Sequence, residues 1–410
     1  MPGTLNFYPA RDGTLGGGLT NRLLHNGAAR CQAAIRTYPW HVMEGGKTMH
    51  CSRLFSVLCA LGVMLMWGGS VMAPQAATLG PGPKVSISLV AQSIPTLLQY
   101  AKVEVPYARE IIPQRSNGRV EVKLSTWSEM SLTGNEIIRL TRQGQVEIGG
   151  APLTYVAGDV PLLDAPDLAG LNPTIAQARK VSEALTPVAN KELERFGVKI
   201  IATLPYPAQV FYCRAPVKEL ADLKGRKIRT FGTSLNDLVV ALGAQAVSIT
   251  FAEVYTSLER GVADCGITGT GSGNAAKWYE VTTHLYTLPV GWSLAAYYVN
   301  LNWWNKPDSD VRQFFEETFK EMENKLWELG AELTQDGIDC NTGRQTCKLG
   351  TLDKDSPMTE VQPTEADKAR LPKILEEAVI PNWVKRCGER CGDIYNQVIA
   401  PISGVKYVKR

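Results

Sequence analysis

Histidine and the motifs of common enzymes are scarce in this sequence. The chain of 410 residues has four histidines, and only His284 lies beyond residue 77. A Ser-His-Asp or Cys-His centre there would have one candidate base, and His284 (in VTTHLY) is expected between secondary-structure elements. The motifs GxSxG, HExxH and GxxxxGK[ST] are absent. We therefore expect no catalytic residues; the alternative, an enzyme, would need His284 or an acidic side chain as its base.

Long hydrophobic runs are also few. Residues 54–67 (LFSVLCALGVMLMW) form an uncharged apolar run, preceded by Lys47 and Arg53 and followed by small residues. This is the layout of a secretory signal, and the run is too short to span a bilayer comfortably. We expect cleavage within residues 73–77 and a soluble periplasmic protein; a retained short anchor is the alternative.

The chain beyond this signal has little net charge. The whole chain has 43 basic and 40 acidic residues, and six of the basic and two of the acidic ones lie in residues 1–77. Residues 78–410 therefore have 37 basic and 38 acidic residues. A nucleic-acid or membrane-surface footprint would need clustered Lys and Arg, so we expect no nucleic-acid partner. Residues 1–77 are expected to be leader and signal peptide. Within them, 1–48 resemble neither a signal nor a domain, and we expect translation to begin at Met43 or Met49.

Cysteine patterns of a metal site are missing, because the part of the chain beyond residue 77 has one histidine and no CxxC pair. We expect no metal and no cofactor. Six cysteines lie in that part, an even number that permits disulfides in an exported chain. Cys340 and Cys347 flank NTGRQT and are expected to close a short loop. Cys387 and Cys391 have helical spacing, unfavourable for bonding each other, so we expect cross-pairing with the first two, Cys213 and Cys265.

Strand and helix patterns alternate along the chain. Strands are predicted at 85–91, 119–124, 146–150, 199–204, 209–214, 227–229, 264–268 and 294–300. Helices are predicted at 97–112, 135–143, 175–195, 236–242, 253–260, 274–281, 309–337 and 373–377, the seventh being unusually long. Thr250 and Glu253 are expected to form a capping box. This alternation predicts an α/β fold with mostly parallel sheets.

Two features suggest an anion site. Arg229, in GRKIRTFGT, lies where a strand meets a loop, the position at which open α/β sheets bind ligands. The planar guanidinium of arginine can donate two parallel hydrogen bonds to a carboxylate, which the lysine ammonium cannot match. The alternative interpretation is that Arg229 is an ordinary surface charge. The glycine-rich run 269–273 (GTGSG) follows a strand and either offers backbone N–H groups to an anion or makes a tight turn.

Several segments together resemble the extracytoplasmic solute receptors of TRAP transporters, a family that includes dicarboxylate and sialic-acid binding proteins. They are DLKGRKIRTFG (222–232), LGAQAVSITFAEVYTSLERGVADCG (242–266) and KWYEVT (277–282). Gly134-Asn135-Glu136 and RQGQVEIG (142–149) match an earlier segment of the family. The order and spacing fit over about residues 84–335.

The resemblance implies a clamp of two lobes, each a mixed sheet flanked by helices, with a long helix bridging them. Lobe I is expected to comprise 84–205 and 294–333, and lobe II 206–293 and 334–410. The family's near-constant arginine, which binds the ligand carboxylate, corresponds to Arg229. A second arginine used by some members falls near Ala208-Gln209 and is missing, which disfavours a doubly charged or sialic-acid-like ligand.

The resemblance also places other residues at the ligand. A phenylalanine of the family corresponds to Phe251, and a polar position, often asparagine, corresponds to Thr268. We expect the loops at Gln92-Ser93 and Ser128-Glu129 to shape the rest of the site. The aromatic side chains Trp278, Tyr155, Tyr212 and Trp292 are either cleft walls suited to an aromatic or apolar monocarboxylate, or core residues.

The expected function is therefore a receptor that captures a small organic acid and delivers it to the TRAP membrane permease, which an ion gradient drives. A binding protein of an ATP-driven importer or of a sensor kinase would share the same clamp and is an alternative. A cation that bridges ligand and protein, as in some members of the family, is a further alternative.

Overall fold

The computed structural model describes residues 77–409. The segment expected to be leader and signal peptide, with Cys31, Cys51 and Cys59, lies outside these residues. Among the helices that are described, none combines the length and the apolar character needed to cross a membrane.

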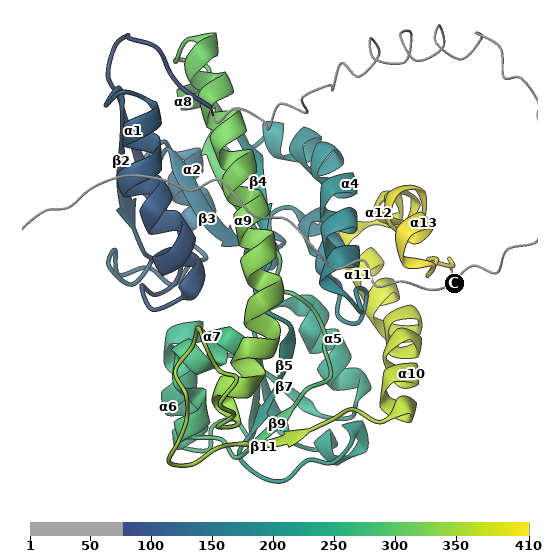
Figure 1. The fold of residues 1–410 in the computed structure, drawn as a ribbon. Helices are drawn as coiled ribbons and strands as arrows, with labels where there is room; N and C mark the ends of the chain where they lie inside the picture. The colour runs from purple at the N-terminus through teal and green to yellow at the C-terminus, as the bar shows by residue number, and fades with distance from the viewer. Residues whose placement is uncertain (1–76, 410) are drawn as a thin grey trace, which may run out of the picture. The chain divides into compact units, whose positions relative to one another are not determined.

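Two mixed sheets form the framework (Figure 1). Sheet A contains, in order, β2 (Val120–Ser125), β1 (Val85–Val90), β3 (Ile148–Pro152), β10 (Ala295–Asn300) and β4 (Val198–Leu204). Sheet B contains, in order, β11 (Thr359–Val361), β9 (His284–Tyr286), β5 (Gln209–Cys213), β8 (Cys265–Gly269), β6 (Lys227–Thr230) and β7 (Gln245–Ser248). We call the part built on sheet A lobe I and the part built on sheet B lobe II.

Each sheet is parallel except where a strand arrives from the other lobe. In sheet A, β1 pairs with β2 and β3 in parallel, whereas β10 is antiparallel to β3 and β4. In sheet B, β6 pairs with β7 and β8 in parallel, whereas β5 is antiparallel to β8 and β9. The predicted α/β class with mixed sheets is confirmed.

Helices cover both sheets. Lobe I carries the helical segment that ends in α1 (Ile112–Arg115), then α2 (Ile137–Arg142), α3 (Leu153–Val156), α4 (Ile175–Glu194) and α8 (Leu301–Trp304). Lobe II carries α5 (Thr233–Ala241), α6 (Val254–Glu259) and α7 (Thr270–Ala275). The C-terminal helices are α10 (Glu365–Ile374), α11 (Ile380–Cys387), α12 (Glu389–Ile394) and α13 (Ala400–Ser403).

The long helix α9 (Ser309–Asn341) runs past both sheets (Figure 1). In its first half, Glu323 accepts hydrogen bonds from the backbone N–H of Thr203 in β4 at 2.8 Å and from its hydroxyl at 2.6 Å. At its end, the Asn341 amide donates to the Tyr212 hydroxyl of β5 at 2.8 Å. The predicted bridging helix is confirmed, and it extends four residues beyond Gly337.

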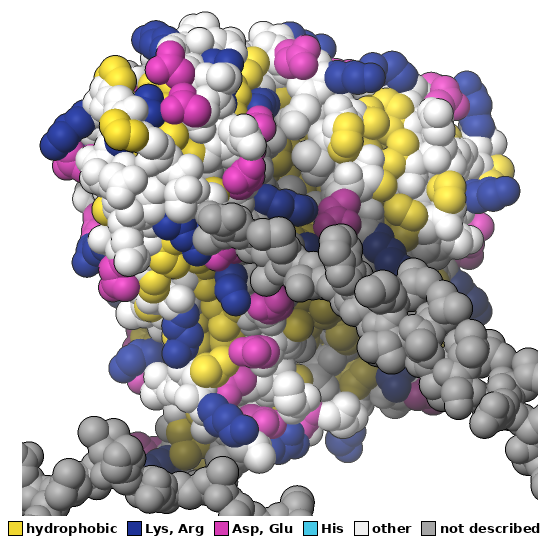
Figure 2. Space-filling model, turned by 45° about the horizontal axis from the view of Figure 1, so that its top comes forward, with side chains coloured by type: hydrophobic (Ala, Val, Ile, Leu, Met, Phe, Trp, Pro, Cys, Tyr) yellow, Lys and Arg dark blue, Asp and Glu magenta, His cyan; other side chains and the backbone are white. Residues whose placement is uncertain are grey.

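The C-terminal helices connect the lobes a second time. The Trp383 indole N–H donates to the carbonyl of Pro161 at 2.8 Å. Arg386 pairs with Asp237 of α5 at 2.7 Å, and Arg390 pairs with Glu192 of α4 at 2.6 Å. Helices α11 and α12 therefore contact elements of both lobes. Basic and acidic side chains are interspersed on the face that Figure 2 shows.

The disulfides differ in part from the expectation. Cys340 bonds Cys347, as predicted, and Cys213 bonds Cys265 between paired positions of β5 and β8. The cross-pairing expected for the last two cysteines is wrong, because Cys387 bonds Cys391. The two do not share a helix: α11 ends at Cys387, and Gly388, at φ 95°, separates it from α12.

Three local predictions are wrong. Thr250 does not cap a helix, because its hydroxyl donates to Glu253 and α6 begins only at Val254. The helix expected from residue 274 begins instead inside the glycine run, at Thr270, since Gly271 and Gly273 let α7 approach α9 and β5 closely. His284 lies in β9 and not between elements.

Candidate functional site

A cavity lies where the two lobes meet, and its empty space, open solvent included, is about 400 Å³. Lobe I lines it with Ser93, Leu97, Trp127, Pro152 and Tyr155. Lobe II lines it with Gln209, Arg229, Phe231, Phe251, Thr268 and Ser272, and the segments that cross between lobes add Tyr206 and Ser293. Many of these residues lie at or just after the carboxyl ends of parallel strands, where open α/β sheets bind ligands.

Arg229 is the cation that lines this cavity. It lies in β6 and is 1% exposed. Its Nε donates to the carbonyl of Ile249 at 3.0 Å, and its Nη1 donates to the carbonyl of Ile267 at 2.9 Å. Its Nη2 has no hydrogen-bond partner among residues 77–409. Two backbone carbonyls thus hold Nε and Nη1 and leave the N–H groups of Nη2 free to donate.

The charge of Arg229 has no acidic neighbour in the described part of the chain. Burial lowers the pKa of the guanidinium to about 10, and the only nearby charge effect comes from Tyr155. Arg229 therefore remains protonated at neutral pH. A buried cation without a counter-ion is costly, so the site favours a ligand that brings a negative charge.

Aromatic rings surround this guanidinium. Its central carbon lies 5.2 Å from the ring centroid of Phe231 and 5.6 Å from that of Trp278. On the lobe I side, the rings of Trp127 and Tyr155 are 5.9 Å apart. Burial raises the pKa of Tyr155, so its hydroxyl keeps its proton. The cavity thus combines one cation with apolar, flat walls.

Five of the nine residues expected at the ligand line this cavity: Arg229, Phe251, Thr268, Ser93 and Tyr155. Trp278 lies one layer behind, fully buried, with its ring centroid 5.7 Å from that of Phe251. Gln92, Tyr212 and Glu129 do not line it.

These three side chains have other contacts. Gln92 is buried and bonded to Glu104 and Tyr206. Tyr212 is buried and its hydroxyl donates to the carbonyl of Thr270 at 2.6 Å. Glu129 is exposed and accepts from Thr126 in the turn that follows β2. Outside the nine, the indole of Trp292 donates to the carbonyl of Asn172, and Trp292 does not line the cavity either.

Several lining residues escaped the sequence analysis. Trp127 and Phe231 each follow or end a parallel strand, so the strand-end rule already used for Arg229 would have found them. Tyr206 and Ser293 lie in the two crossing segments, whose positions depend on how the lobes pack. Ser293 has φ 46°, a conformation that its sequence does not indicate.

A second cluster, at the end of α9, gathers potential metal ligands. Asp336, Cys340 and Cys347 lie close together, but the two sulfurs are bonded to each other. The Asp336 carboxylate accepts the backbone N–H groups of Lys348 at 2.6 Å and Gly350 at 2.9 Å. These atoms are engaged in closing the loop and carry no metal-site proposal.

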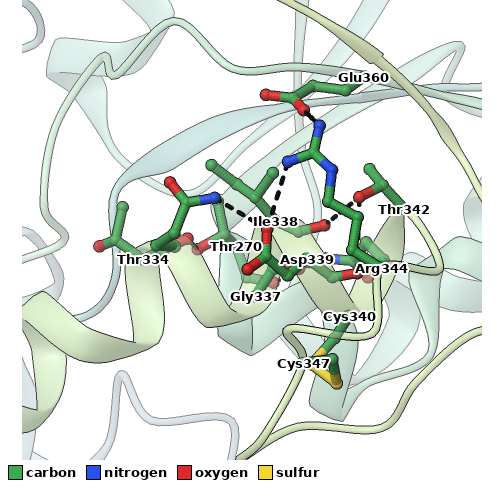
Figure 3. A network of polar contacts seen from close by, with 12 residues as sticks. Thr270, Thr334, Gly337, Ile338, Asp339, Cys340, Thr342, Arg344, Cys347 and Glu360 are labelled. Atoms are coloured by element: carbon green, nitrogen blue, oxygen red, sulfur yellow. Dashed lines mark hydrogen bonds and ion pairs between the residues drawn. A yellow bond between two sulfur atoms is a disulfide. The ribbon is translucent and has the colours of Figure 1, made fainter.

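The same loop is tied to sheet B by an arginine (Figure 3). Arg344 donates to Asp339 of α9 at 3.2 Å and pairs with Glu360 of β11. The disulfide Cys340–Cys347 closes the turn beside this network (Figure 3). The cluster therefore fastens the chain after α9 to lobe II.

Curated proteins resemble this chain in sequence. The chain is 25% identical over 233 residues to a "solute-binding protein" of Albidiferax ferrireducens, covering 56% of this chain and 65% of that protein. It is 28% identical to the 2,3-diketo-L-gulonate-binding periplasmic protein YiaO of Escherichia coli, covering 56% of this chain and 71% of YiaO. The chain thus spans about two thirds of the length of these curated relatives.

A solved structure shows the same fold. The Bordetella pertussis receptor DctP7, an extracytoplasmic solute receptor binding pyroglutamic acid, superposes with a TM-score of 0.68 at 20% identity, over 78% of this chain and 99% of that one. This confirms the fold expected from the sequence. Residues 102–363, more than half of the chain, match the family model described as bacterial extracellular solute-binding protein, family 7. The chain therefore belongs to this family, and the resemblance to TRAP solute receptors is confirmed.

Proposed function

We propose that this protein is an exported receptor that binds a small organic acid at Arg229 and delivers it to the membrane subunits of a TRAP transporter. One observation carries the proposal: a fully buried guanidinium lines the cavity and has no acidic partner among residues 77–409. A carboxylate in the cavity would supply the missing counter-ion and accept from the free Nη2.

The energetics favour a carboxylate held in a closed cavity. An ion pair strengthens when water is excluded, and a bidentate arginine–carboxylate pair is among the stronger hydrogen-bonded contacts. Each charge is costly to bury alone. We infer that the ligand and Arg229 compensate each other, which makes binding and closure mutually supportive.

We further propose a monocarboxylate with a flat or ring-shaped body. Arg229 is the one charged side chain that lines the cavity in the described part of the chain, so a second carboxylate would have no cation to meet. Phe231, Phe251 and Trp127 offer apolar faces. The compounds named for YiaO and DctP7, 2,3-diketo-L-gulonate and pyroglutamic acid, are organic acids. An aromatic monocarboxylate is the member of this class that uses the walls most fully.

We also propose that the protein binds this acid without transforming it. No histidine or carboxylate lines the cavity among the residues described, and His284 lies in β9 at the far side of sheet B from β6. Mass spectrometry of the ligand after long incubation tests this point. Recovery of the unchanged acid is expected, whereas accumulation of a product would contradict it.

The main test is thermal melting of the purified protein against a panel of aromatic and aliphatic organic acids. At about 100 times its dissociation constant a ligand should stabilise by about 2.7 kcal/mol, a shift of a few degrees. We expect a shift with one class of monocarboxylates and none with Arg229→Met. Arg260→Met, an exposed position in α6's C-cap, is the matched control and should behave as wild type. A shift that survives Arg229→Met would refute the proposed anchor.

A further inference from the structure

Gln209, at the start of β5, is one of the polar residues that line the cavity. It lines the main cavity and an adjoining one of about 400 Å³. Its Nε2 donates to the carbonyl of Pro207 at 2.8 Å. Because a carbonyl can only accept, this bond fixes which end of the amide is the nitrogen. Oε1 therefore points away from Pro207, and no residue in 77–409 donates to it.

Tyr206 is limited to accepting by a chain of hydrogen bonds that ends at Glu104. The Glu104 carboxylate accepts from Gln92 Nε2 at 2.6 Å and from the Tyr297 hydroxyl. Because the Gln92 amide nitrogen donates to Glu104, the Gln92 oxygen is the end that faces Tyr206, whose hydroxyl donates to it. The single proton of the Tyr206 hydroxyl is then used, so this residue of the cavity lining can offer its oxygen only as an acceptor.

Ser272 adds an unpartnered hydroxyl to the same region. Ser272 is buried and lines the cavity, and its Oγ has no hydrogen-bond partner among the described residues. A methyl group added at Gly269 would lie 3.0 Å from Ser272 Oγ and 3.1 Å from Gln209 Nε2. The Ser272 hydroxyl and the Gln209 amide thus both lie close to Gly269, and we call this part of the lining the corner.

We propose that the ligand carries, besides its carboxylate, a hydrogen-bond donor, an N–H or O–H group, that Gln209 Oε1 and Tyr206 Oη accept in this corner. The inference rests on the proposed function and narrows it to acids with a donor. A ligand without one leaves buried acceptors unpaired, and sites of this kind discriminate strongly against analogues that lack the group.

A metal cation is a less favourable occupant of the corner. Hard cations in proteins are held mainly by carboxylates, and no carboxylate lines the main cavity in the described residues. Asp164 and Asp167 line the adjoining cavity, but Asp164 accepts from Thr233 and Asp167 accepts from backbone N–H groups. The neutral oxygens of Gln209, Tyr206 and Ser272 suit a neutral donor better.

The experiment compares pairs of acids that differ only in the donor. One pair is pyroglutamate and its lactone analogue, 5-oxotetrahydrofuran-2-carboxylate, in which an oxygen replaces the ring N–H. A second pair is mandelate and phenylacetate, which differ in a hydroxyl group. Titration calorimetry at pH 8 with a chelator present should give about tenfold tighter binding for the donor-bearing member of each pair that binds.

Two variants locate the effect. Gln209→Met keeps the length of the side chain but has no acceptor amide, and Tyr206→Phe removes only the phenolic oxygen. Each should reduce the preference, Gln209→Met to about twofold or less, because the donor-bearing acid should lose more affinity than the donorless one. Gln245→Met, at an exposed position of β7, is the matched control and should keep the full preference. Gly269→Ala should weaken both members of a pair by filling the corner.

The outcomes separate this inference from the proposed function. Equal or tighter binding of the donorless acids, or a preference that survives both Gln209→Met and Tyr206→Phe, would overturn the inference and leave the receptor function intact. Binding that appears only when Ca²⁺ or Mg²⁺ is added would show that the corner holds a cation and would also overturn it. Failure of every acid to bind, or binding unaffected by Arg229→Met, would instead refute the proposed function.

Discussion

Lobe I and lobe II each bury a charged group without an opposite charge beside it. In lobe II this group is Arg229, and in lobe I it is Glu104, which is fully buried in the helical segment before α1. Burial lowers the pKa of Arg229 to about 10 and raises that of Glu104 to about 7. Glu104 can thus avoid the cost of a buried charge by taking up a proton near neutral pH, whereas Arg229 stays charged.

The location of the two groups matches this difference. Glu104 lies behind Gln92 and does not line the cavity, and its charge is eased by hydrogen bonds from Gln92 and Tyr297. Arg229 lines the cavity. The buried cation that keeps its charge thus lines the cavity, whereas the buried acid that can take up a proton lies in the core. The charge in lobe I orients hydrogen bonds in the core, and under the proposed function the charge in lobe II attracts the ligand.

The largest effect is expected at Arg229. Arg229→Lys keeps a positive charge but loses the fork that holds the carbonyls of Ile249 and Ile267 and grips a carboxylate. We expect affinity for the organic acid to fall about 100-fold, or about 2.7 kcal/mol. Calorimetry on wild type and on this variant measures it. Unchanged affinity would show that attraction by charge alone suffices and that the fork has no special role.

Another carboxylate of lobe I, the part-buried Asp167, offers the sharpest contrast with Glu104. It accepts the backbone N–H of Trp292 at 3.0 Å and of Leu294 at 3.2 Å, in the segment that crosses to β10, and burial raises its pKa to about 7. Asp167→Asn places an NH₂ group among these donors and leaves some of them unpaired. We expect a loss of about 2 kcal/mol in the free energy of unfolding. Urea denaturation at pH 8 measures it, and a variant as stable as wild type would contradict this role.

Glu104→Gln should behave in the opposite way. The native pKa of Glu104, about 7, exceeds its ordinary value of 4.5, so the native state binds this proton more tightly than the unfolded chain. Its contribution to the free energy of unfolding therefore falls as pH rises from about 4.5 to 7. Glutamine has no proton to lose. Between pH 5 and pH 8 we expect the variant to gain about 1–2 kcal/mol relative to wild type.

The control for this prediction is to compare the free energies of unfolding of wild type and Glu104→Gln at each pH. Asp167 lowers the free energy of unfolding of both proteins as pH rises, so its effect cancels in the difference. Urea denaturation at several pH values supplies it. A difference that does not change with pH would contradict the prediction. It would mean that Glu104 does not change its protonation state in the native protein between pH 5 and pH 8.

The sequence was sufficient for the parts that depend on local pattern. The helix predicted at 309–337 was recovered within four residues because its apolar side repeats without interruption. Arg229 was found because the end of a parallel strand is a position that topology alone brings to the cleft. Cys387 and Cys391 were misassigned because helical spacing was assumed across Gly388, whose positive φ ends the helix.

The remaining site residues depend on how distant segments pack. Gln209 and Tyr206 become acceptors only because Pro207 and Gln92 take their donors, and these bonds exist only once the crossing segment is in place. Glu104 belongs to a predicted helix, but no periodicity shows that its carboxylate faces the core. Trp278 and Phe251 were grouped as ligand contacts, and packing places one behind the other.

The smallest effect tests how the aromatic rings support the charge in lobe II. Phe231→Leu keeps an apolar contact but removes the ring face 5.2 Å from the Arg229 guanidinium carbon. A cation–π contact contributes about 0.5–1 kcal/mol at exposed sites and about 2 when desolvated. The contact between Arg142 and Phe196 provides the matched control, because the two groups are 4.8 Å apart and Arg142 is exposed.

We expect Phe231→Leu to lower the free energy of unfolding by about 1 kcal/mol and the ligand affinity by about twofold. Phe196→Leu should lower the free energy of unfolding by less and leave the ligand affinity unchanged. Equal losses of stability in both variants would mean that the rings act through packing alone, because burial should strengthen only the contact with the cation.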